Sequence, residues 1–465
     1  MEQNAALKKY TLMVAAITSF LTPFMTSSVN LAIPAIGRQF GADAYMLSWV
    51  VTSYILASAA FLLPFGRLAD IVGRKKVFLV GVLSFGLFSL LCGMAWSVQS
   101  LIVFRVLQGI GGAMIFGTGL AILTSVFPLR ERGKVLGINV AMVYIGLSLG
   151  PVLGGTMNHN LGWPSIFYLT ALLAVPVVAL AVTKLKGDWA GAGGEKFDLT
   201  GAILYIIGLV ALMYGFSSMA ASEQGVYILA AGLLLMLVFI RRESNLRQPL
   251  MNLRLFSRNV TFAFSNLAAL TNYSAFAAIF LLSLHLQVVL GYDSQAAGFI
   301  MLAQPVIMAV ISPFAGRLSD RVEPRVVASW GMAMTTLGLL VFCFISRDTP
   351  LWLLVANMSL LGTGFALFSS PNSNALMSAV DKKYYGVASS TLGTMRLVGQ
   401  AFSMAVVTML LALHVGRAEL AAASAGQFLD AARMSFIILT VLCLGGFFAS
   451  LARGNLRSGE APGDP

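Results

Sequence analysis

Apolar residues occur along the chain in long runs, which short polar segments separate. Each run holds roughly 20 residues, the length that an α-helix needs to cross a bilayer core of about 30 Å. The runs do not alternate polar and apolar residues as the strands of a membrane barrel do, so the pattern predicts helices. We place fourteen spans, at residues 10–35, 46–66, 77–96, 99–126, 135–157, 163–184, 198–218, 225–241, 259–290, 294–316, 326–346, 350–376, 385–414 and 431–453.

Composition supports an all-α integral membrane protein. Hydrophobic residues make up 58% of the 465-residue chain and charged residues 10%, whereas a soluble domain carries about 25% charged residues. The three cysteines, at positions 92, 343 and 443, fall inside apolar runs and have no metal-binding spacing. We therefore expect no metal, no cofactor and no enzymatic activity.

The basic residues indicate the orientation of the spans. Loops on the side of the N-terminus hold 24 Lys and Arg residues, loops on the other side hold 4, and Arg105 and Arg396 lie inside spans. Because positive loops stay in the cytoplasm, we expect both termini to be cytoplasmic and the protein to lie in a bacterial inner membrane. The net charge of +12 is then a topology signal and needs no nucleic-acid partner.

A charged loop occurs twice, as GRLADIVGRKKV at 66–77 and as GRLSDRVEPRVV at 316–327. Such duplication is typical of transporters whose two halves move about a site between them. Eight spans separate the two loops instead of six, which predicts two inserted spans. The expected division is an N-terminal six-helix half at 1–186, a linker with accessory spans seven and eight at 187–258, and a C-terminal six-helix half at 259–465. We expect the Gly-rich linker to be flexible.

The first loop resembles the signature loop of the major facilitator superfamily. The residues that carry this resemblance, and that would form a cytoplasmic gate, are Gly66, Asp70, Gly73 and Arg74, with Asp320 in the second copy. The second copy departs from the pattern, because Glu323-Pro324 stands where the first copy has Gly73-Arg74.

Further motifs extend the resemblance: one in span four is similar to the family's second motif, and one in span five resembles the motif that marks its antiporters. Matches in spans two, nine, twelve and thirteen support the fourteen-span drug:proton antiporter branch. Span four carries Arg105 followed by Gln108-Gly109, and a charge inside the membrane costs roughly 3 kcal/mol or more unless it is partnered. An alternative role for this arginine is structural, bonding to backbone carbonyls. Span five carries Gly146, Gly150, Pro151 and Gly154, whose glycine spacing lets another helix approach closely.

The chain departs from that branch in span one, where the branch usually has an Asp. Met25 occupies this position, although Asn30 and Pro34 match. All 18 acidic residues fall in loops or near span ends, and Asp43 and Asp198 are expected to cap helices. His285 is then a weak candidate for a proton site; the alternative is a histidine that replaces an aromatic residue at the membrane interface.

Together these features predict a secondary transporter that exports amphipathic, drug-like compounds by alternating access, in exchange for protons and as a monomer. The predicted substrate pathway consists of Met25, Asn30, Tyr54, Arg105, Gln108, Asn139, Tyr144, Asn272, Tyr273, Gln304, Asn372, Asn374 and Arg396. Because the acid is missing, an exporter or flippase of lipid-like or anionic substrates with weak or no proton coupling is the alternative. A membrane-embedded enzyme is disfavoured by the three scattered histidines, and a receptor built on a transporter fold stays open.

Overall fold

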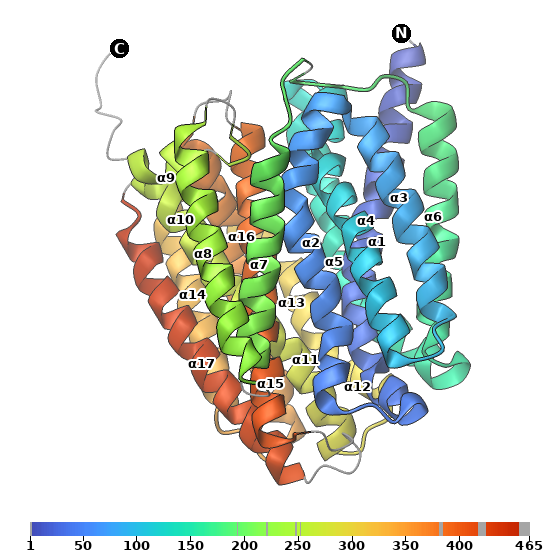
Figure 1. Ribbon diagram of the computed structural model, residues 1–465, viewed down its shortest axis with the longest axis vertical. Helices are drawn as coiled ribbons and strands as arrows, with labels where there is room; N and C mark the ends of the chain where they lie inside the picture. The colour runs from blue at the N-terminus through green and yellow to red at the C-terminus, as the bar shows by residue number, and fades with distance from the viewer. Residues whose placement is uncertain are drawn as a thin grey trace.

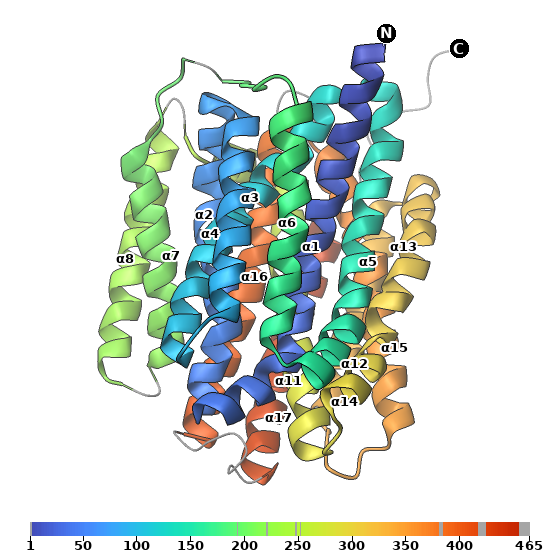
Figure 2. The same cartoon turned by 90° about the vertical axis from the view of Figure 1, so that its right-hand side faces the viewer.

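The chain folds into a bundle of long α-helices, drawn from a computed structural model in Figures 1 and 2. The structure describes residues 2–454 except 193, 220–221, 247–248, 252, 381–384 and 417–424. Fourteen helical segments within these ranges are long and apolar enough to cross a membrane, which confirms the predicted number of spans.

The first six spans form the N-terminal half. They are α1 (Glu2–Phe40), α2 (Ala44–Val72), α3 (Arg74–Gly93), α4 (Val98–Val126), α5 (Leu129–Leu161) and α6 (Pro164–Lys184). Helix α1 packs against α5, α2 packs against α4, and α3 contacts both α4 and α6. Asp43 caps α2 as predicted, because its carboxylate accepts a hydrogen bond from the Met46 amide at 2.7 Å.

Spans seven and eight form a hairpin of α7 (Leu199–Ser218) and α8 (Gln224–Asn245) on one side of the bundle (Figure 2). Helix α7 contacts both α2 and α16, so it lies over the seam between the two halves. The Tyr205 hydroxyl donates to the Ala59 carbonyl at 3.2 Å, and the rings of Phe216 and Phe402 are 5.4 Å apart. The hairpin is thus attached to both halves.

Asp198 caps α7, as predicted, and joins it to α8. Its carboxylate accepts from the Gly201 amide at 3.1 Å and pairs with Arg242 at 2.9 Å. Partial burial raises the pKa of Asp198, but the hydrogen bonds from Arg242 and Gly201 outweigh burial and bring the pKa below its ordinary value.

The C-terminal half follows the short helix α9 (Leu253–Arg258). Its ninth span is broken into α10 (Val260–Tyr273), the 3₁₀ turn η1 (Ser274–Phe276), α11 (Ala277–Leu284) and the π-helical turn η2 (His285–Val289). The remaining helices are α12 (Ser294–Met301), α13 (Ala303–Arg321), α14 (Pro324–Phe342), α15 (Leu351–Ser378), α16 (Tyr385–His414) and α17 (Ala425–Ala452). Span ten is interrupted at Leu302, where Pro305 denies the Met301 carbonyl its helical donor.

Helix α1 begins and α17 ends at the same face of the bundle, the upper face in Figure 1. This face, called the terminal face below, also holds the α2–α3 loop and the linker 185–198. The opposite end is called the far face. A shared face for both ends agrees with an even number of spans.

Candidate functional site

The two halves meet near the far face through a carbonyl that a proline leaves without its helical donor. Pro34 has no N–H, so the Asn30 carbonyl four residues earlier loses its usual partner. Ser283, on α11 of the other half, donates to that carbonyl at 2.8 Å and is fully buried. Asn30 takes part through its backbone, since its buried side-chain amide has no hydrogen-bond partner.

Helices α5 and α12 close the far face a short distance away. The Ser294 hydroxyl donates to the Gly155 carbonyl at 3.1 Å. A Cβ atom at Gly155 would overlap the Ser294 carbonyl oxygen, and one at Gly298 would overlap the Pro151 carbonyl oxygen. The two backbones approach this closely only because both positions are glycine.

The glycines of span five face α1 of the same half. A Cβ at Gly146 would lie 2.5 Å from the Phe20 carbonyl oxygen, and Cβ atoms at Gly150 and Gly154 would lie 2.6 Å from side chains of α1. The close approach that their spacing predicts is therefore present. Pro151 frees the Leu147 carbonyl, and a hydroxyl of α1 donates to it at 3.4 Å.

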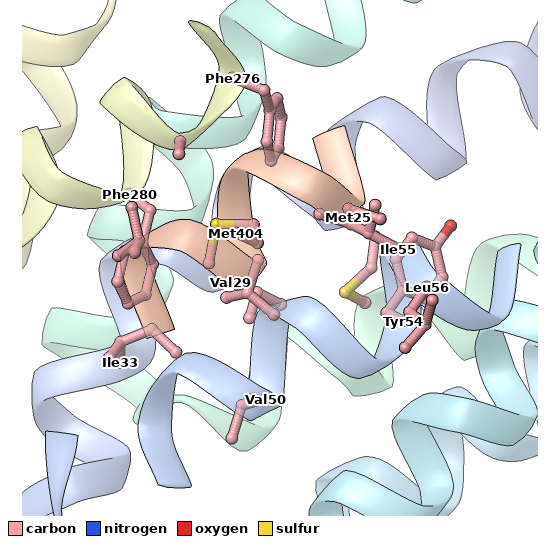
Figure 3. Packing of buried hydrophobic residues seen from close by; sticks show 14 of the residues in the cluster. Met25, Val29, Ile33, Val50, Tyr54, Ile55, Leu56, Phe276, Phe280 and Met404 are labelled. Atoms are coloured by element: carbon pink, nitrogen blue, oxygen red, sulfur yellow. The ribbon is translucent and has the colours of Figure 1, made fainter. Parts of the chain in front are cut away.

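Apolar side chains fill the seam between the halves in this conformation. Figure 3 shows Met25, Tyr54, Phe276, Phe280 and Met404 converging from α1, α2, η1, α11 and α16. All five are at most 8% exposed, and Met25 is fully buried beside Tyr54. The buried thioether of Met25 therefore occupies the position where the family resemblance places an acid.

Arg105 and Gln108 lie in the interior of the N-terminal half and are fully buried. The Arg105 guanidinium donates to the Val50 carbonyl at 3.0 Å and to the Gln108 amide oxygen at 2.5 Å, and it stacks 4.3 Å from the centre of the Tyr54 ring. Gln108 in turn donates to the Ser89 hydroxyl at 2.6 Å. Arg105 is thus held by neutral groups, which is the structural alternative stated above.

Arg396 belongs to a polar cluster that includes both halves. Its guanidinium donates to the Ser373 hydroxyl at 2.8 Å and lies 5.1 Å from the centre of the Tyr273 ring, while the Tyr273 hydroxyl is 3.2 Å from that of Ser369. The N-terminal half contributes Tyr144, whose hydroxyl accepts from Ser312 of α13 at 3.1 Å. We call these six residues, Tyr144, Tyr273, Ser312, Ser369, Ser373 and Arg396, the cross-half cluster.

Asn372 binds Arg453, a buried arginine at the end of the last span. Its amide donates to the Ser265 carbonyl at 3.1 Å, and its oxygen accepts from Arg453 at 2.7 Å. Arg453 is 1% exposed, and burial, followed by the charge of Arg325, lowers its pKa to about 10. Asn372 therefore helps to anchor the end of α17.

Four other predicted pathway residues contact neighbours within one half. Asn139 accepts from Ser19 at 2.6 Å, Asn272 donates to Thr335 at 3.4 Å, Asn374 donates to Ser319 at 3.4 Å, and the backbone of Gln304 lies against Gly362. These contacts lie within one half, whereas the cross-half cluster joins side chains of both halves.

His285 begins the π-helical turn and is 1% exposed, with neither ring nitrogen bonded. It lies inside the bundle rather than at an interface with water or lipid headgroups. π-Helical turns occur often at functional sites, and a buried imidazole without partners is costly. Among the residues that the structure describes, no group of three His, Cys, Asp or Glu side chains is arranged to hold a metal.

The charged loop at the terminal face is fixed by the linker. Arg74 pairs with Asp70 at 2.8 Å and donates to Ser125 at 2.8 Å, which ties the α2–α3 loop to α4. The linker adds an Arg67–Glu195 ion pair and a hydrogen bond from the Arg74 amide to the Asp188 carbonyl at 2.7 Å. This part of the linker thus has fixed contacts, which differs from the predicted flexibility.

Two features of the structure at position 73 require a glycine. Its φ is 120°, and a Cβ there would lie 3.0 Å from the Asp188 side chain and 3.3 Å from its carbonyl oxygen. Gly66 faces the other half, since a Cβ there would lie 3.9 Å from the Ser390 hydroxyl of α16. The side chain of Asp320, the predicted gate residue of the second copy, lies outside the described part of the chain.

No pattern in the sequence points to Ser283, Ser312, Ser369 or Ser373. Small hydroxyl residues are frequent in membrane helices, where most donate to their own helix, so only the tertiary contacts distinguish these four. A carbonyl freed by a proline is the one local feature that could have pointed to a partner such as Ser283.

Two helical halves that meet in close contacts and share a polar cluster are the architecture of a membrane transporter. The sequence model described as Major Facilitator Superfamily matches residues 15–404, and it matches again over 262–462. The chain therefore belongs to the Major Facilitator Superfamily and is a multi-pass membrane transporter, not an enzyme.

The chain resembles both named transporters and solved structures. It is 29% identical to the riboflavin transporter RibZ of Clostridioides difficile strain 630, over 95% of this chain and 96% of RibZ. It is 33% identical to the multidrug resistance protein Stp of Mycobacterium tuberculosis, over 86% of this chain and 75% of Stp. Its fold matches an inward-facing crystal structure of a bacterial homologue of the lysosomal transporter Spinster, with a TM-score of 0.70, 15% identity, and coverage of 98% and 99% of the two chains.

Proposed function

We propose that this transporter exports amphipathic organic compounds by alternating access, as a monomer in a bacterial cytoplasmic membrane with both termini inside. The observation that carries the proposal is the glycine-mediated contact of α5 and α12, which seals the far face while the cross-half cluster lies nearer the terminal face. The naming of relatives as multidrug and riboflavin transporters supports a small organic substrate. The excess of basic residues in loops of the terminal face supports the orientation.

The energy source has two candidates. Proton antiport is what the resemblance to drug:proton antiporters implies, and it requires a titratable group that each side reaches in turn. His285 is the candidate for that group. Export of lipid-like or anionic compounds with weak or no proton coupling is favoured by two observations, the buried Met25 in place of an acid and the acid-free surroundings of Arg105 in the described structure.

Transport by purified protein in proteoliposomes tests the proposal. Three fluorescent probes, cationic ethidium, neutral riboflavin and anionic fluorescein, are followed with and without an imposed pH gradient. We expect at least one probe to cross faster than in protein-free liposomes. Loss of this flux when nigericin collapses the gradient supports antiport, and persistence supports the uncoupled exporter. If no probe moves faster than in protein-free liposomes, organic export is contradicted.

A further inference from the structure

Arg105 and Arg396 lie well away from the ends of their membrane spans, and they differ in how far their charge is open to a ligand. Arg105 is 0% exposed and is enclosed by Val50, Gln108 and Tyr54. Arg396 is only partly buried, and its Nε–H has no hydrogen-bond partner. Each arginine has one buried nitrogen without a hydrogen-bond partner, but only the Arg396 side chain is partly exposed.

The charge of Arg396 is not neutralised by the described residues. No Asp or Glu of the described ranges lies within ion-pair distance of it, and its contacts are the neutral Ser373 hydroxyl and the Tyr273 ring. An unpaired cation at membrane depth is costly. A ligand anion would offset that cost, and guanidinium groups bind carboxylates and similar oxyanions through charge-assisted hydrogen bonds.

The neighbours of Arg396 fit an aromatic anion. The Tyr144 hydroxyl accepts from Ser312, and Tyr144 also lies close to Ser369 and Arg396. The Tyr273 ring lies under the guanidinium and packs edge-on against Phe365, with ring centres 5.8 Å apart. Cationic, hydroxyl and aromatic groups thus converge at one place.

The cluster lies at a depth suited to a substrate site. Arg396 is nine residues into the span Val387–His414, and Ser369 is nine residues from the end of α15 at Ser378. At 1.5 Å per residue, each residue lies about 14 Å from the end of its membrane span at the terminal face. Because Tyr144 belongs to one half and Arg396 to the other, a ligand bound here contacts both moving units.

We propose that the cross-half cluster is a binding subsite for the anionic group of an aromatic, amphipathic substrate, with Arg396 as the charge-recognising residue. This inference rests on the proposed export function and specifies its substrate class. Arg105 has no direct contact with the substrate in this arrangement and serves to hold α2 against α4.

The test compares Arg396→Gln and Arg396→Lys with wild type, using fluorescein, ethidium and riboflavin in proteoliposomes. Arg38→Gln is the matched control, because Arg38 is exposed at the far end of α1. For Arg396→Gln we expect the KM for fluorescein to rise about 10- to 100-fold, the effect of losing a charged hydrogen-bond partner, with little change for ethidium and riboflavin. Arg396→Lys is expected to recover part of the affinity, and Arg38→Gln to behave as wild type.

Two results would overturn the subsite: an unchanged KM for fluorescein in Arg396→Gln, or an equal loss for all three probes, which indicates a structural role. Equilibrium binding of fluorescein to the detergent-solubilised protein, measured by fluorescence anisotropy, separates this inference from the export function. If wild type transports nothing but binds fluorescein, and Arg396→Gln loses that binding, export fails and the subsite stands. If wild type does not bind fluorescein, the subsite fails.

Discussion

The Ser283 hydroxyl donates to the Asn30 carbonyl across the two halves, at 2.8 Å. This carbonyl is available because Pro34 removes its helical donor, and both residues of the pair are fully buried. A proline in one half and a hydroxyl in the other thus form a contact that joins the halves near the far face. In the alternating-access cycle that we propose, opening the far face would break this contact, so the pair would contribute to the balance between the two access states.

Replacing Ser283 by alanine is expected to shift that balance towards a state with an open far face. A buried carbonyl left without a donor costs about 1–3 kcal/mol, which corresponds to a factor of roughly 5 to 150 in the ratio of the two states. A cysteine at Gln295, on the far end of α12, reports opening through its rate of labelling by an impermeant maleimide. Faster labelling in the Ser283→Ala background than in the Ser283→Thr background supports the contact, and equal rates contradict it.

Replacing Gly298 by alanine is expected to prevent closure of the far face. The added Cβ would overlap the Pro151 carbonyl oxygen, a backbone atom that has little freedom to move. We expect transport to fall at least about tenfold while the amount of folded protein stays near that of wild type, since the clash is absent when α5 and α12 separate. Gly119→Ala is the control, because no atom lies within 4 Å of a Cβ at that helical position. Equal losses in both variants would contradict the gate.

The fold could be predicted from the sequence because its signals are local. The length of an apolar run decides whether it spans a membrane, and the basic loops mark one face of the protein. Both the number of spans and the insertion of spans seven and eight can therefore be predicted from the sequence. Asp43 and Asp198 were expected to cap helices because an acid that precedes an apolar run accepts from the first amides.

The site was harder to predict because its contacts are long-range. Arg453 stands at the end of the last apolar run, yet it is buried against Asn372, 81 positions away in sequence. The linker was expected to be flexible from its glycines, but Glu195 pairs with Arg67 across 128 positions. Neither composition nor spacing specifies which distant charge or amide meets which, so these contacts appear only in the folded chain.

Replacing Arg105 by lysine is expected to destabilise the N-terminal half. Lysine keeps the charge but loses the planar fork that reaches the Val50 carbonyl and Gln108 while stacking on Tyr54. The loss of one buried hydrogen bond and the stacking contact is expected to cost about 2 kcal/mol or more. Thermal unfolding in detergent measures the effect, with Arg38→Lys as the exposed control. A melting temperature equal to that of the control would show that the network does not hold the half together.

Removing both linker ion pairs, with Asp188→Asn and Glu195→Gln together, is expected to loosen the linker without unfolding the protein. The Lys76–Asp188 pair and the Arg67–Glu195 pair are partly exposed, and such pairs contribute about 0–1 kcal/mol each. We expect trypsin to cleave at Lys186 and Lys196 several-fold faster than in wild type, and 1 M salt to have a similar effect on wild type. Glu223→Gln, an exposed residue outside the linker, is the control. Unchanged cleavage would show that the backbone hydrogen bonds alone fix the segment.

Replacing Met25 by aspartate is expected to favour cationic substrates. Met25 is fully buried beside Tyr54, whose hydroxyl has no hydrogen-bond partner, and Arg105 stacks on the same ring with one unpartnered nitrogen. A carboxylate placed here gains a potential donor in Tyr54 and a nearby positive charge, which limits the cost of burying it. We expect the rate of ethidium export in proteoliposomes to rise at least about threefold and to become dependent on pH.

Met25→Asn is the matched control for Met25→Asp, because it supplies the same shape and polarity without a titratable proton. If residue 25 lies on the pathway and an acid there carries the proton, only the aspartate variant gains pH-dependent ethidium export. If both variants behave alike, the effect comes from polarity in a sealed core and the position has no role in coupling. Since neither variant alters the cross-half cluster, fluorescein transport should stay within about twofold of wild type in both, which separates a coupling defect from a folding defect.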